Sequence, residues 1–328
     1  MKSIVIAGGS GFLGRRLISH WLNLGYEVTL LTRSPHGMPN VRELIWDGRT
    51  VGAWATALNG SAVVINLAGR SVNCRYHARN RSLILDSRVE STRAIGNAIA
   101  RCQVPPPVWL NASTATIYRH TYGPPWNEEG LIGPDAAAKD AFSVHVATAW
   151  EAALNDSLTP STRKVALRTS MVLGCAKNSV FPMLRRLTRM GLGGRMGSGH
   201  QFVSWIHVSD FCRAVDWIIA DRALSGPVNV AAPNPVTNAE LMATMRAVCG
   251  MRFGLPAPAW LLEIGAVFLR TETELIIKSR RVIPAKLLAA GFAFNYTELR
   301  QALENLNQPS SVKTPLKVID SAEKAARR

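Results

Sequence analysis

The sequence predicts an α/β protein with a doubly wound parallel sheet and a smaller, mostly helical C-terminal region. Three observations carry this prediction. Short apolar runs alternate with segments of helical period from the start of the chain, a pattern typical of parallel strands joined by helices. A glycine-rich turn joins the first predicted strand to the first predicted helix. From Thr237 to about Leu306, helical segments dominate instead.

The first strand and the first helix have the clearest patterns. Residues 4–7 are four consecutive apolar residues and predict a buried strand. A helix is predicted next, because apolar residues recur three or four positions apart at Leu13, Leu17, Trp21 and Leu24. Gly25 ends this helix, because glycine readily adopts the left-handed conformation that closes many helices.

Three glycines lie between this strand and this helix with the spacing G-x-x-G-x-x-G. Free backbone N–H groups and the helix dipole can hold a pyrophosphate at such a turn. Gly8 allows the tight turn, Gly11 lets the chain approach the phosphates, and Gly14 lets the helix pack closely on the sheet. The alternative is a plain strand-to-helix turn. We expect a dinucleotide to be bound here by Gly8, Ser10, Gly11, Phe12, Leu13 and Gly14.

The end of the next strand indicates which dinucleotide binds. Residues 27–32 predict this second strand, and the position that follows it normally selects the cofactor. An acidic residue there would hold the ribose 2′-hydroxyl of NAD, but the chain has Arg33 and Ser34. Arginine pairs with a 2′-phosphate through two hydrogen bonds, and serine adds a hydroxyl donor. The prediction is NADP(H), and the alternative is that Arg33 is a solvated side chain at a strand end.

The alternation of strands and helices continues to residue 174. Residues 62–67 indicate a strand that is buried on both faces. The other strands of this part are predicted at residues 41–46, 108–112 and 165–168. The helical segments between them are predicted at residues 51–58, 78–101 and 142–155.

The pattern changes after Gly174 and predicts a division of the chain. Residues 190–200 hold five glycines and predict a loop near a ligand, and residues 227–235 predict a strand followed by a turn. The polar, basic last stretch shows little periodicity and predicts a flexible tail. We expect an NADP-binding Rossmann domain at 1–174 to which 202–232 return, a substrate-side region at 175–201 and 233–307, and the tail at 308–328.

The charge balance favours an anionic ligand. The chain of 328 residues carries 38 basic and 22 acidic residues, a net charge of +16. Such a balance suits NADP or a nucleotide sugar, and also nucleic acid. The basic residues are spread along the chain, without zinc-ligand spacing or an aromatic–basic RNA motif, which argues against nucleic acid. No apolar run reaches the ~18 residues that span a bilayer, so we expect no membrane segment.

Five cysteines are present, an odd number without any C-x-x-C pair. This usage predicts buried thiols in a reducing compartment rather than a disulfide framework or a metal site. Because the first strand begins by residue 4, we expect no signal peptide and a cytoplasmic protein. Related folds often pair through helices, and by that analogy alone a homodimer is a hypothesis.

Several motifs together resemble a known family. Residues 8–14, 66–69 and 113–118 are similar to an extended or atypical short-chain dehydrogenase/reductase. Residues 205–210 resemble the W-I-H-x-x-D segment of nucleotide-sugar epimerase relatives. The segments at 256–260, 279–284 and 291–292 resemble the small appended domain of unknown function in the epimerase-like family labelled NAD-dependent epimerase. The resemblance covers nearly the whole chain except the tail.

The resemblance implies roles for residues at two more strand ends. It implies that the cofactor's adenine and ribose lie along Asn66, Leu67, Ala68 and Gly69. Arg88, on the next helix, either reaches a phosphate or stays solvated. The resemblance also implies that Thr114, with Ser113 beside it, polarises a substrate C–O group, since a hydroxyl can donate to a developing oxyanion. The alternative is that both hydroxyls cap the strand end.

The chain departs from the pattern of those enzymes in the proton-transfer pair. They use a tyrosine with a lysine four residues later, and this chain has Phe142 and Val146 in their places. His145 is the nearest replacement, because histidine titrates in a suitable range. Tyr118, Tyr122 and His207 are further candidates for the proton donor. A lone histidine is more often structural. We expect the substrate cleft to be surrounded by Tyr118, Arg168, Gln201, Trp205 and His207.

Two functional hypotheses follow from these residues. The first is an NADP(H)-dependent oxidoreductase or epimerase-like isomerase that acts on an unidentified small-molecule substrate, which a nucleotide-linked compound would fit. The second is a catalytically silent NADP(H)-binding sensor or regulatory protein. The missing Tyr-x-x-x-Lys pair favours the second, and the intact cofactor turn and the hydroxyl pair favour the first.

Overall fold

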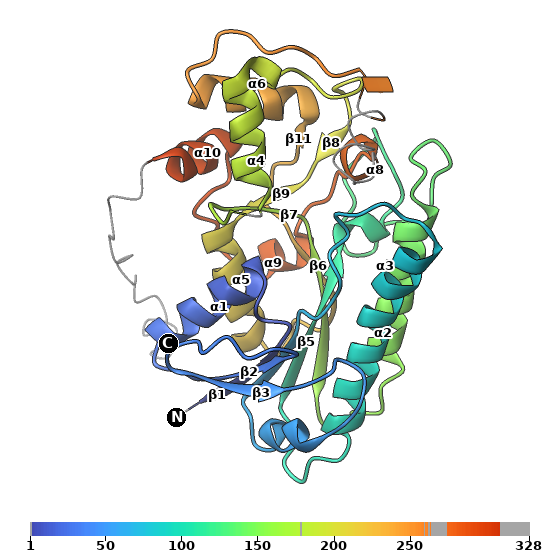
Figure 1. Cartoon of the computed structure of the whole chain (residues 1–328), viewed down its shortest axis with the longest axis vertical. Coiled ribbons are helices and arrows are strands. Elements are labelled where there is room, and N and C mark those ends of the chain that lie inside the picture. The colour runs from blue at the N-terminus through green and yellow to red at the C-terminus, as the bar shows by residue number, and fades with distance from the viewer. Residues whose placement is uncertain (1, 178, 259, 262, 264–273, 309–328) are drawn as a thin grey trace.

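The central element of the fold is a seven-stranded sheet in which every strand pair is parallel (Figure 1). The computed structural model describes residues 2–177, 179–258, 260–261, 263 and 274–308. The strand order is β10-β6-β5-β4-β1-β2-β3, which confirms the predicted doubly wound α/β fold. The strands are β1 (Ser3–Ala7), β2 (Glu27–Thr32), β3 (Val41–Ile45), β4 (Val63–Asn66), β5 (Val108–Thr114), β6 (Arg163–Thr169) and β10 (Gly226–Val230).

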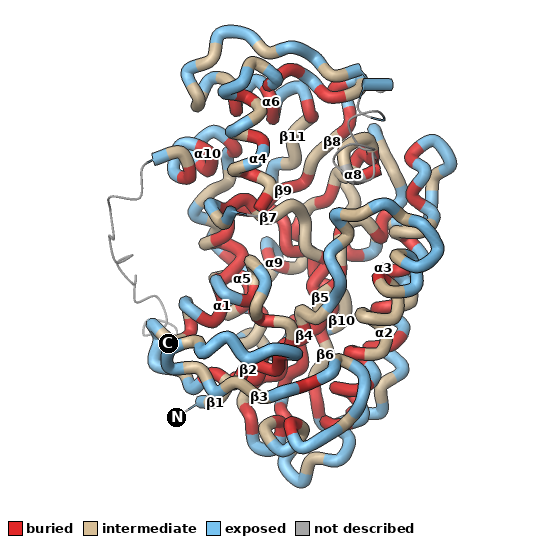
Figure 2. The backbone as a smooth tube through the Cα atoms, in the orientation of Figure 1, coloured by how far each residue is buried: buried red, intermediate tan, exposed pale blue. Residues whose placement is uncertain are grey.

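Helices cover both faces of this sheet because each buries an apolar stripe against it (Figure 1). On one face α1 (Phe12–Asn23) and α5 (Val208–Ala220) form a shared core with the strands. On the other face α2 (Ala78–Ile99) and α3 (Ala141–Asn155) do the same, together with the short helix η1 (Ala53–Leu58). Figure 2 shows the buried backbone concentrated between these layers.

A smaller region, mostly helical, lies beyond the carboxyl ends of the strands (Figure 1). Its core joins three helices through side chains such as Phe181, Met242 and Leu303. Its helices are α4 (Val180–Leu187), η3 (Thr188–Leu192), α6 (Asn238–Val248), α8 (Glu274–Ile277) and α10 (Leu299–Asn307), whereas α9 (Ala285–Ala289) packs against β10 and the core of the main sheet. Two small sheets connect it to the main body, formed by β7 (Met171–Leu173) with β9 (Trp205–His207) and by β8 (Phe202–Val203) with β11 (Val236–Thr237).

The elements of the main sheet lie within a few residues of their predicted ranges, whereas the smaller region differs more. The strands β7, β8, β9 and β11 have two or three residues each, too few to show a period of two. The predicted glycine loop at 190–200 begins with the end of η3. Within residues 202–232, β10 joins the main sheet, whereas β8 and β9 belong to the small sheets. The predicted tail lies outside the described residues after Gln308.

No helix in the described part of the chain has the length and apolar character needed to cross a bilayer. Among the described residues, no group of three or more His, Cys, Asp or Glu side chains is arranged to hold a metal ion. All five cysteines are free, but only Cys212 is buried and Cys175 is exposed, so the expectation of buried thiols is wrong for Cys175.

Candidate functional site

The glycine turn lies where the strand order reverses, between β1 and β4, the point at which open α/β sheets bind ligands. Gly8 has a φ of +69°, and a Cβ on it would lie 2.6 Å from the backbone of Ala68. A Cβ on Gly14 would lie 2.3 Å from the Cα of Gly9. Glycine is therefore required at both positions for the close packing of the turn on β4 and on α1.

Gly11 differs from these two glycines because an added Cβ would meet nothing within 4 Å. Gly11 is also the N-cap of α1, and no side chain caps this helix end. The first turn of α1 holds no acidic residue, so its free N–H groups and positive dipole end are available to an anion. These features fit a pyrophosphate at the start of α1.

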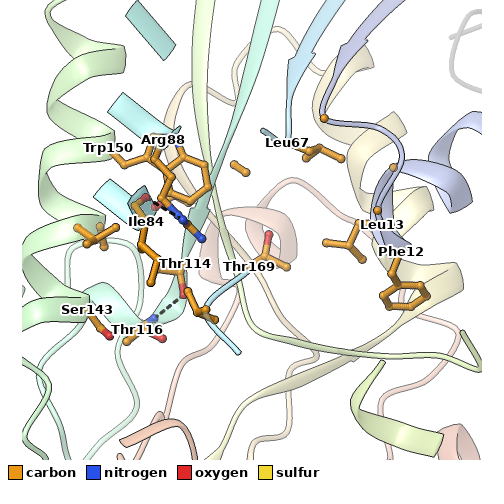
Figure 3. A pocket seen from close by; sticks show the side chains of 18 of the residues that line it. Phe12, Leu13, Leu67, Ile84, Arg88, Thr114, Thr116, Ser143, Trp150 and Thr169 are labelled. Carbon is orange, nitrogen blue, oxygen red and sulfur yellow. Dashed lines mark hydrogen bonds between the residues drawn. The ribbon is translucent and has the colours of Figure 1, made fainter. Parts of the chain in front are cut away.

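A pocket of about 380 Å³ runs from this turn to the carboxyl end of β5 (Figure 3). Phe12, Leu13 and Leu67 line the end near the glycine turn, and Thr114, Thr116 and Ser143 line the other end. The wall between them is largely apolar and is formed by residues such as Ile84, Val146, Ala147 and Trp150. The pocket is thus an apolar cleft with polar groups at its two ends, the usual form of a cofactor site.

Among the described residues that line this pocket, Arg88 is the one arginine or lysine. Its guanidinium stacks on the Trp150 ring at 5.0 Å and donates to the carbonyl oxygens of Arg70 and Ile84, at 3.1 and 3.0 Å. Burial lowers the pKa of Arg88 to about 10, so the group stays charged at neutral pH. No carboxylate of the described residues forms an ion pair with it, which leaves its charge available to a phosphate.

The segment after β4 divides into structural and pocket-lining residues. The Asn66 side chain is fully buried and donates to the Asn111 side chain at 2.8 Å, so it orders β4 against β5 rather than lining the pocket. Leu67 lines the pocket. The Ala68 backbone packs on Gly8, and a Cβ on Gly69 would touch the Arg88 guanidinium at 3.2 Å.

Arg33 and Ser34 are exposed just beyond the end of β2. The Gly8 amide donates to the carbonyl oxygen of Leu31 at 3.2 Å, which holds the end of β2 beside the glycine turn. The Ser34 amide donates to the Thr32 hydroxyl at 3.3 Å and fixes the turn that carries Arg33. Both side chains therefore stay candidates for contact with a 2′-phosphate.

The hydroxyl groups at the far end of the pocket are not equivalent. Ser113 donates to Glu151 at 2.6 Å, so its proton is already engaged. Thr114 accepts from the backbone amide of Thr116 at 3.1 Å, and no described residue accepts its hydroxyl proton. Thr114 is therefore the better donor to a ligand oxygen.

The two residues that stand in place of the tyrosine–lysine pair lie on the helix α3. Phe142 and Val146 both line the pocket, and neither can transfer a proton. His145 lies between them in sequence but is exposed, and it does not line the pocket. Ser143 does line it, because it lies three and four residues before Val146 and Ala147 and so shares their face of the helix.

Ser143 has a buried acidic partner that the sequence did not indicate. The Ser143 hydroxyl donates to Oε2 of Glu274 at 2.9 Å. Glu274 is 5% exposed, and its Oε1 has no hydrogen-bond partner among the described residues. Burial raises the pKa of Glu274 above its usual range. The nearby Lys278 is fully committed, because its Nζ lies 2.5 Å from the buried Asp140 carboxylate and donates to the Thr116 carbonyl at 2.6 Å.

The predicted substrate residues Tyr118 and Arg168 belong to a buried network instead of lining the pocket. Arg168 binds both carboxylate oxygens of Glu151 at 2.8 Å and donates to the Tyr118 hydroxyl at 2.8 Å. The Tyr118 hydroxyl donates to the Asn229 side chain at 2.8 Å. This network ties β5, β6 and β10 to α3.

The remaining predicted substrate residues are also buried and paired. Gln201 donates to the Met196 carbonyl at 2.7 Å, and Trp205 donates to the Asn234 carbonyl at 3.0 Å. His207 is the N-cap of α5, and burial lowers its pKa to about 4, so it is neutral at pH 7. Tyr122 is half exposed and stacks edge-on against His120. None of these residues lines the pocket, so the structure does not bring them to Thr114.

Two family models match the chain. The NAD dependent epimerase/dehydratase family matches residues 4–231, and a domain of unknown function (DUF1731) matches residues 257–306. The human epimerase family protein SDR39U1 is 31% identical over 306 residues, 92% of this chain and 99% of the relative. The epimerase family protein YfhF of Bacillus subtilis is 30% identical over 313 residues, 93% of this chain and 97% of the relative.

Solved structures of epimerase family proteins are also similar to this chain. The crystal structure of human SDR39U1 (isoform 2) with NADPH has a TM-score of 0.82 and 30% identity, and it covers 93% of this chain and 99% of its own. The nucleoside-diphosphate sugar epimerase of Corynebacterium glutamicum has a TM-score of 0.73 and 27% identity, over 93% of this chain and 58% of that chain. The chain therefore belongs to the NAD dependent epimerase/dehydratase family, and its last part matches the appended domain of unknown function.

Proposed function

We propose that this chain binds NADPH and catalyses hydride transfer to or from a small carbonyl or alcohol substrate. The observation that carries the proposal is the single pocket that joins the start of α1 to the hydroxyl groups of Thr114 and Ser143. The presence of NADPH in the structure of human SDR39U1 supports the choice of cofactor, as does Arg33 beside the glycine turn. The epimerase relatives suggest a nucleotide-linked substrate.

The residues at the two ends of the pocket have separate tasks in this proposal. The N–H groups at the start of α1 hold the pyrophosphate, and Arg88 neutralises part of its charge. When bound, the cofactor supplies or accepts the hydride. Thr114 donates a hydrogen bond to the substrate oxygen, which stabilises the negative charge that develops there. The apolar wall at Val146 and Trp150 excludes water from the reacting atoms.

Ser143 and Glu274 supply the proton in place of the missing tyrosine and lysine. During reduction the substrate carbon gains the hydride, and the substrate oxygen takes the Ser143 hydroxyl proton. This step uses the protonated form of Glu274, which burial favours by raising the pKa of the carboxyl group: the Ser143 hydroxyl turns from Glu274 to the substrate oxygen, and Glu274 returns a proton to the Ser143 oxygen and becomes a carboxylate. Oxidation follows the same path in reverse, with Glu274 as the base.

Replacing Glu274 with glutamine tests this path. We expect Glu274→Gln and Ser143→Ala each to lower kcat by about 100-fold or more while NADPH affinity changes little, because neither residue lies near the glycine turn. In the wild type, reduction should slow as the pH rises through the raised pKa of Glu274, and Glu274→Gln should lose this dependence. NADPH absorbance over a panel of aldehydes, ketones and nucleotide sugars measures turnover, with product analysis because an epimerase returns its hydride.

Thr148→Ala is the matched control, because Thr148 is exposed on the same helix as Ser143. It should keep the wild-type rate. Unchanged rates in both Glu274→Gln and Ser143→Ala would contradict the proton path. A large loss of kcat in His145→Ala instead would indicate that His145, the replacement predicted from the sequence, transfers the proton.

The second candidate is a catalytically silent NADPH-binding protein. It is favoured by one observation, that Phe142 and Val146 line the pocket at the positions where the catalytic pair is expected. Tight NADPH binding with no turnover over the whole panel, and no isotope exchange into any product, would select this candidate.

A further inference from the structure

A second pocket of about 560 Å³ adjoins the first and shares Tyr76 and Phe142 with it. Its lining residues come from the segments at the starts of α2 and α3 and from α8. Its lining is basic, with one acidic residue, and consists of Arg75, Tyr76, His77, Arg81, Lys139, Ala141, Phe142 and Glu274.

Two helices begin at this pocket, and neither start is capped by a side chain. His77 is the N-cap of α2, and Asp140 is the N-cap of α3. The first turns of both helices hold no acidic residue, and the Asp140 carboxylate is engaged by Lys278 instead. Two positive helix ends therefore face one cavity, with their first N–H groups free of helical partners.

The side chains of this pocket are arranged for an anion. Arg81 stacks on the Phe142 ring at 5.0 Å, and its Nε donates to the Tyr76 carbonyl at 2.7 Å, which fixes the guanidinium at the wall. Lys139 is exposed at the rim, 3.2 Å from Glu263. Glu274 is the one acidic residue among the described residues of the lining, and its buried Oε1 has no hydrogen-bond partner there.

We propose that this second pocket binds a phosphoryl group of the substrate while the reacting carbon lies in the first pocket beside Thr114. The inference rests on the proposed function and narrows the substrate to phosphorylated carbonyl or alcohol compounds. The shared residues Tyr76 and Phe142 form the passage between the two groups of such a substrate. Arg81, the start of α2 and the start of α3 hold its phosphoryl oxygens, and Lys139 adds positive charge at the rim.

Phenyl phosphate tests this site without any need for turnover. The full-length protein is first saturated with NADPH, so that the cofactor's own phosphate positions are filled, and then titrated calorimetrically with phenyl phosphate. We expect saturable binding that weakens as salt is added. Arg81→Met and Lys139→Met should each weaken it by about tenfold. Arg101→Met, which alters an exposed arginine just beyond the opposite end of α2, should leave it unchanged.

Methionine at position 81 keeps an unbranched side chain over Phe142, and the thermal unfolding and NADPH affinity of each variant show whether it is folded. Lys139→Met keeps the test valid if Arg81→Met unfolds, because Lys139 is exposed. No saturable binding, or the same affinity in wild type and in folded Arg81→Met and Lys139→Met, would overturn the inference. Tighter binding of benzoate than of phenyl phosphate would overturn the phosphoryl assignment. If the protein had no affinity for NADPH but still bound phenyl phosphate, the proposed function would be overturned and the phosphate site would stand.

Discussion

Replacing Arg168 with methionine is expected to lower the free energy of unfolding by about 3–5 kcal/mol. Arg168 is 4% exposed and pairs with both oxygens of Glu151 at 2.8 Å. Methionine keeps much of the side-chain volume but leaves the Glu151 charge buried without its cation, and the Tyr118 hydroxyl loses a donor. The large cost comes from this uncompensated charge rather than from the lost contact itself. Urea unfolding followed by circular dichroism measures the change.

The exposed pair of Arg300 and Glu304 on α10 provides the control. Its atoms are 3.6 Å apart, and both side chains are more than half exposed. Arg300→Met should therefore cost about 0.5 kcal/mol or less, because water screens the pair. If Arg168→Met costs no more than this control, the network is not the structural element described above, and Arg168 becomes available again as a substrate residue.

Replacing Gly11 with alanine is expected to weaken NADPH binding by roughly 10- to 100-fold while the stability of the free protein stays the same. Gly11 has a φ of −76°, which alanine adopts without strain, and the added Cβ would touch no protein atom within 4 Å. The methyl group would instead occupy the space in front of the free N–H groups of α1. Losing a close approach to a charged phosphate costs about 1.5–3 kcal/mol, or roughly 10- to 100-fold in affinity.

Gly52→Ala is the matched glycine control. An added Cβ there meets only the Trp54 ring, at 3.5 Å, and Gly52 does not line the cofactor pocket. Both variants should melt at the wild-type temperature, and only Gly11→Ala should lose NADPH affinity. Unchanged affinity in Gly11→Ala would mean that the pyrophosphate does not lie at the start of α1.

The main sheet could be predicted from the sequence because its strands and helices carry strong local periods. Residues 62–67 are almost wholly apolar, as expected for β4 at the centre of the sheet. The smaller region could not be predicted in this detail. Its strands, such as β8 at Phe202–Val203, are two or three residues long and pair with distant segments, so no local pattern predicts them.

The cofactor end of the site could also be predicted from the sequence, since the glycines that form it lie close together, within residues 8–14. The other end was not. Glu274 meets Ser143 from 131 residues away, and nothing near either residue indicates the pair. Tyr118 and Arg168 follow strand ends as ligand-binding residues do, but the acid that engages Arg168 lies on α3. Polar residues at strand ends thus serve structure or function, and only their partners distinguish the two.

The central claim is that the turn at 8–14 and the end of β2 together bind NADPH. The most direct test is calorimetric titration of the purified wild type and of Arg33→Ala with NADPH and with NADH. We predict that the wild type binds NADPH at least about tenfold tighter than NADH, because a bidentate arginine–phosphate pair supplies the difference. Arg33→Ala should lose that difference and keep its NADH affinity. A folded wild-type protein with no affinity for either nucleotide, or with a preference for NADH, would contradict the claim.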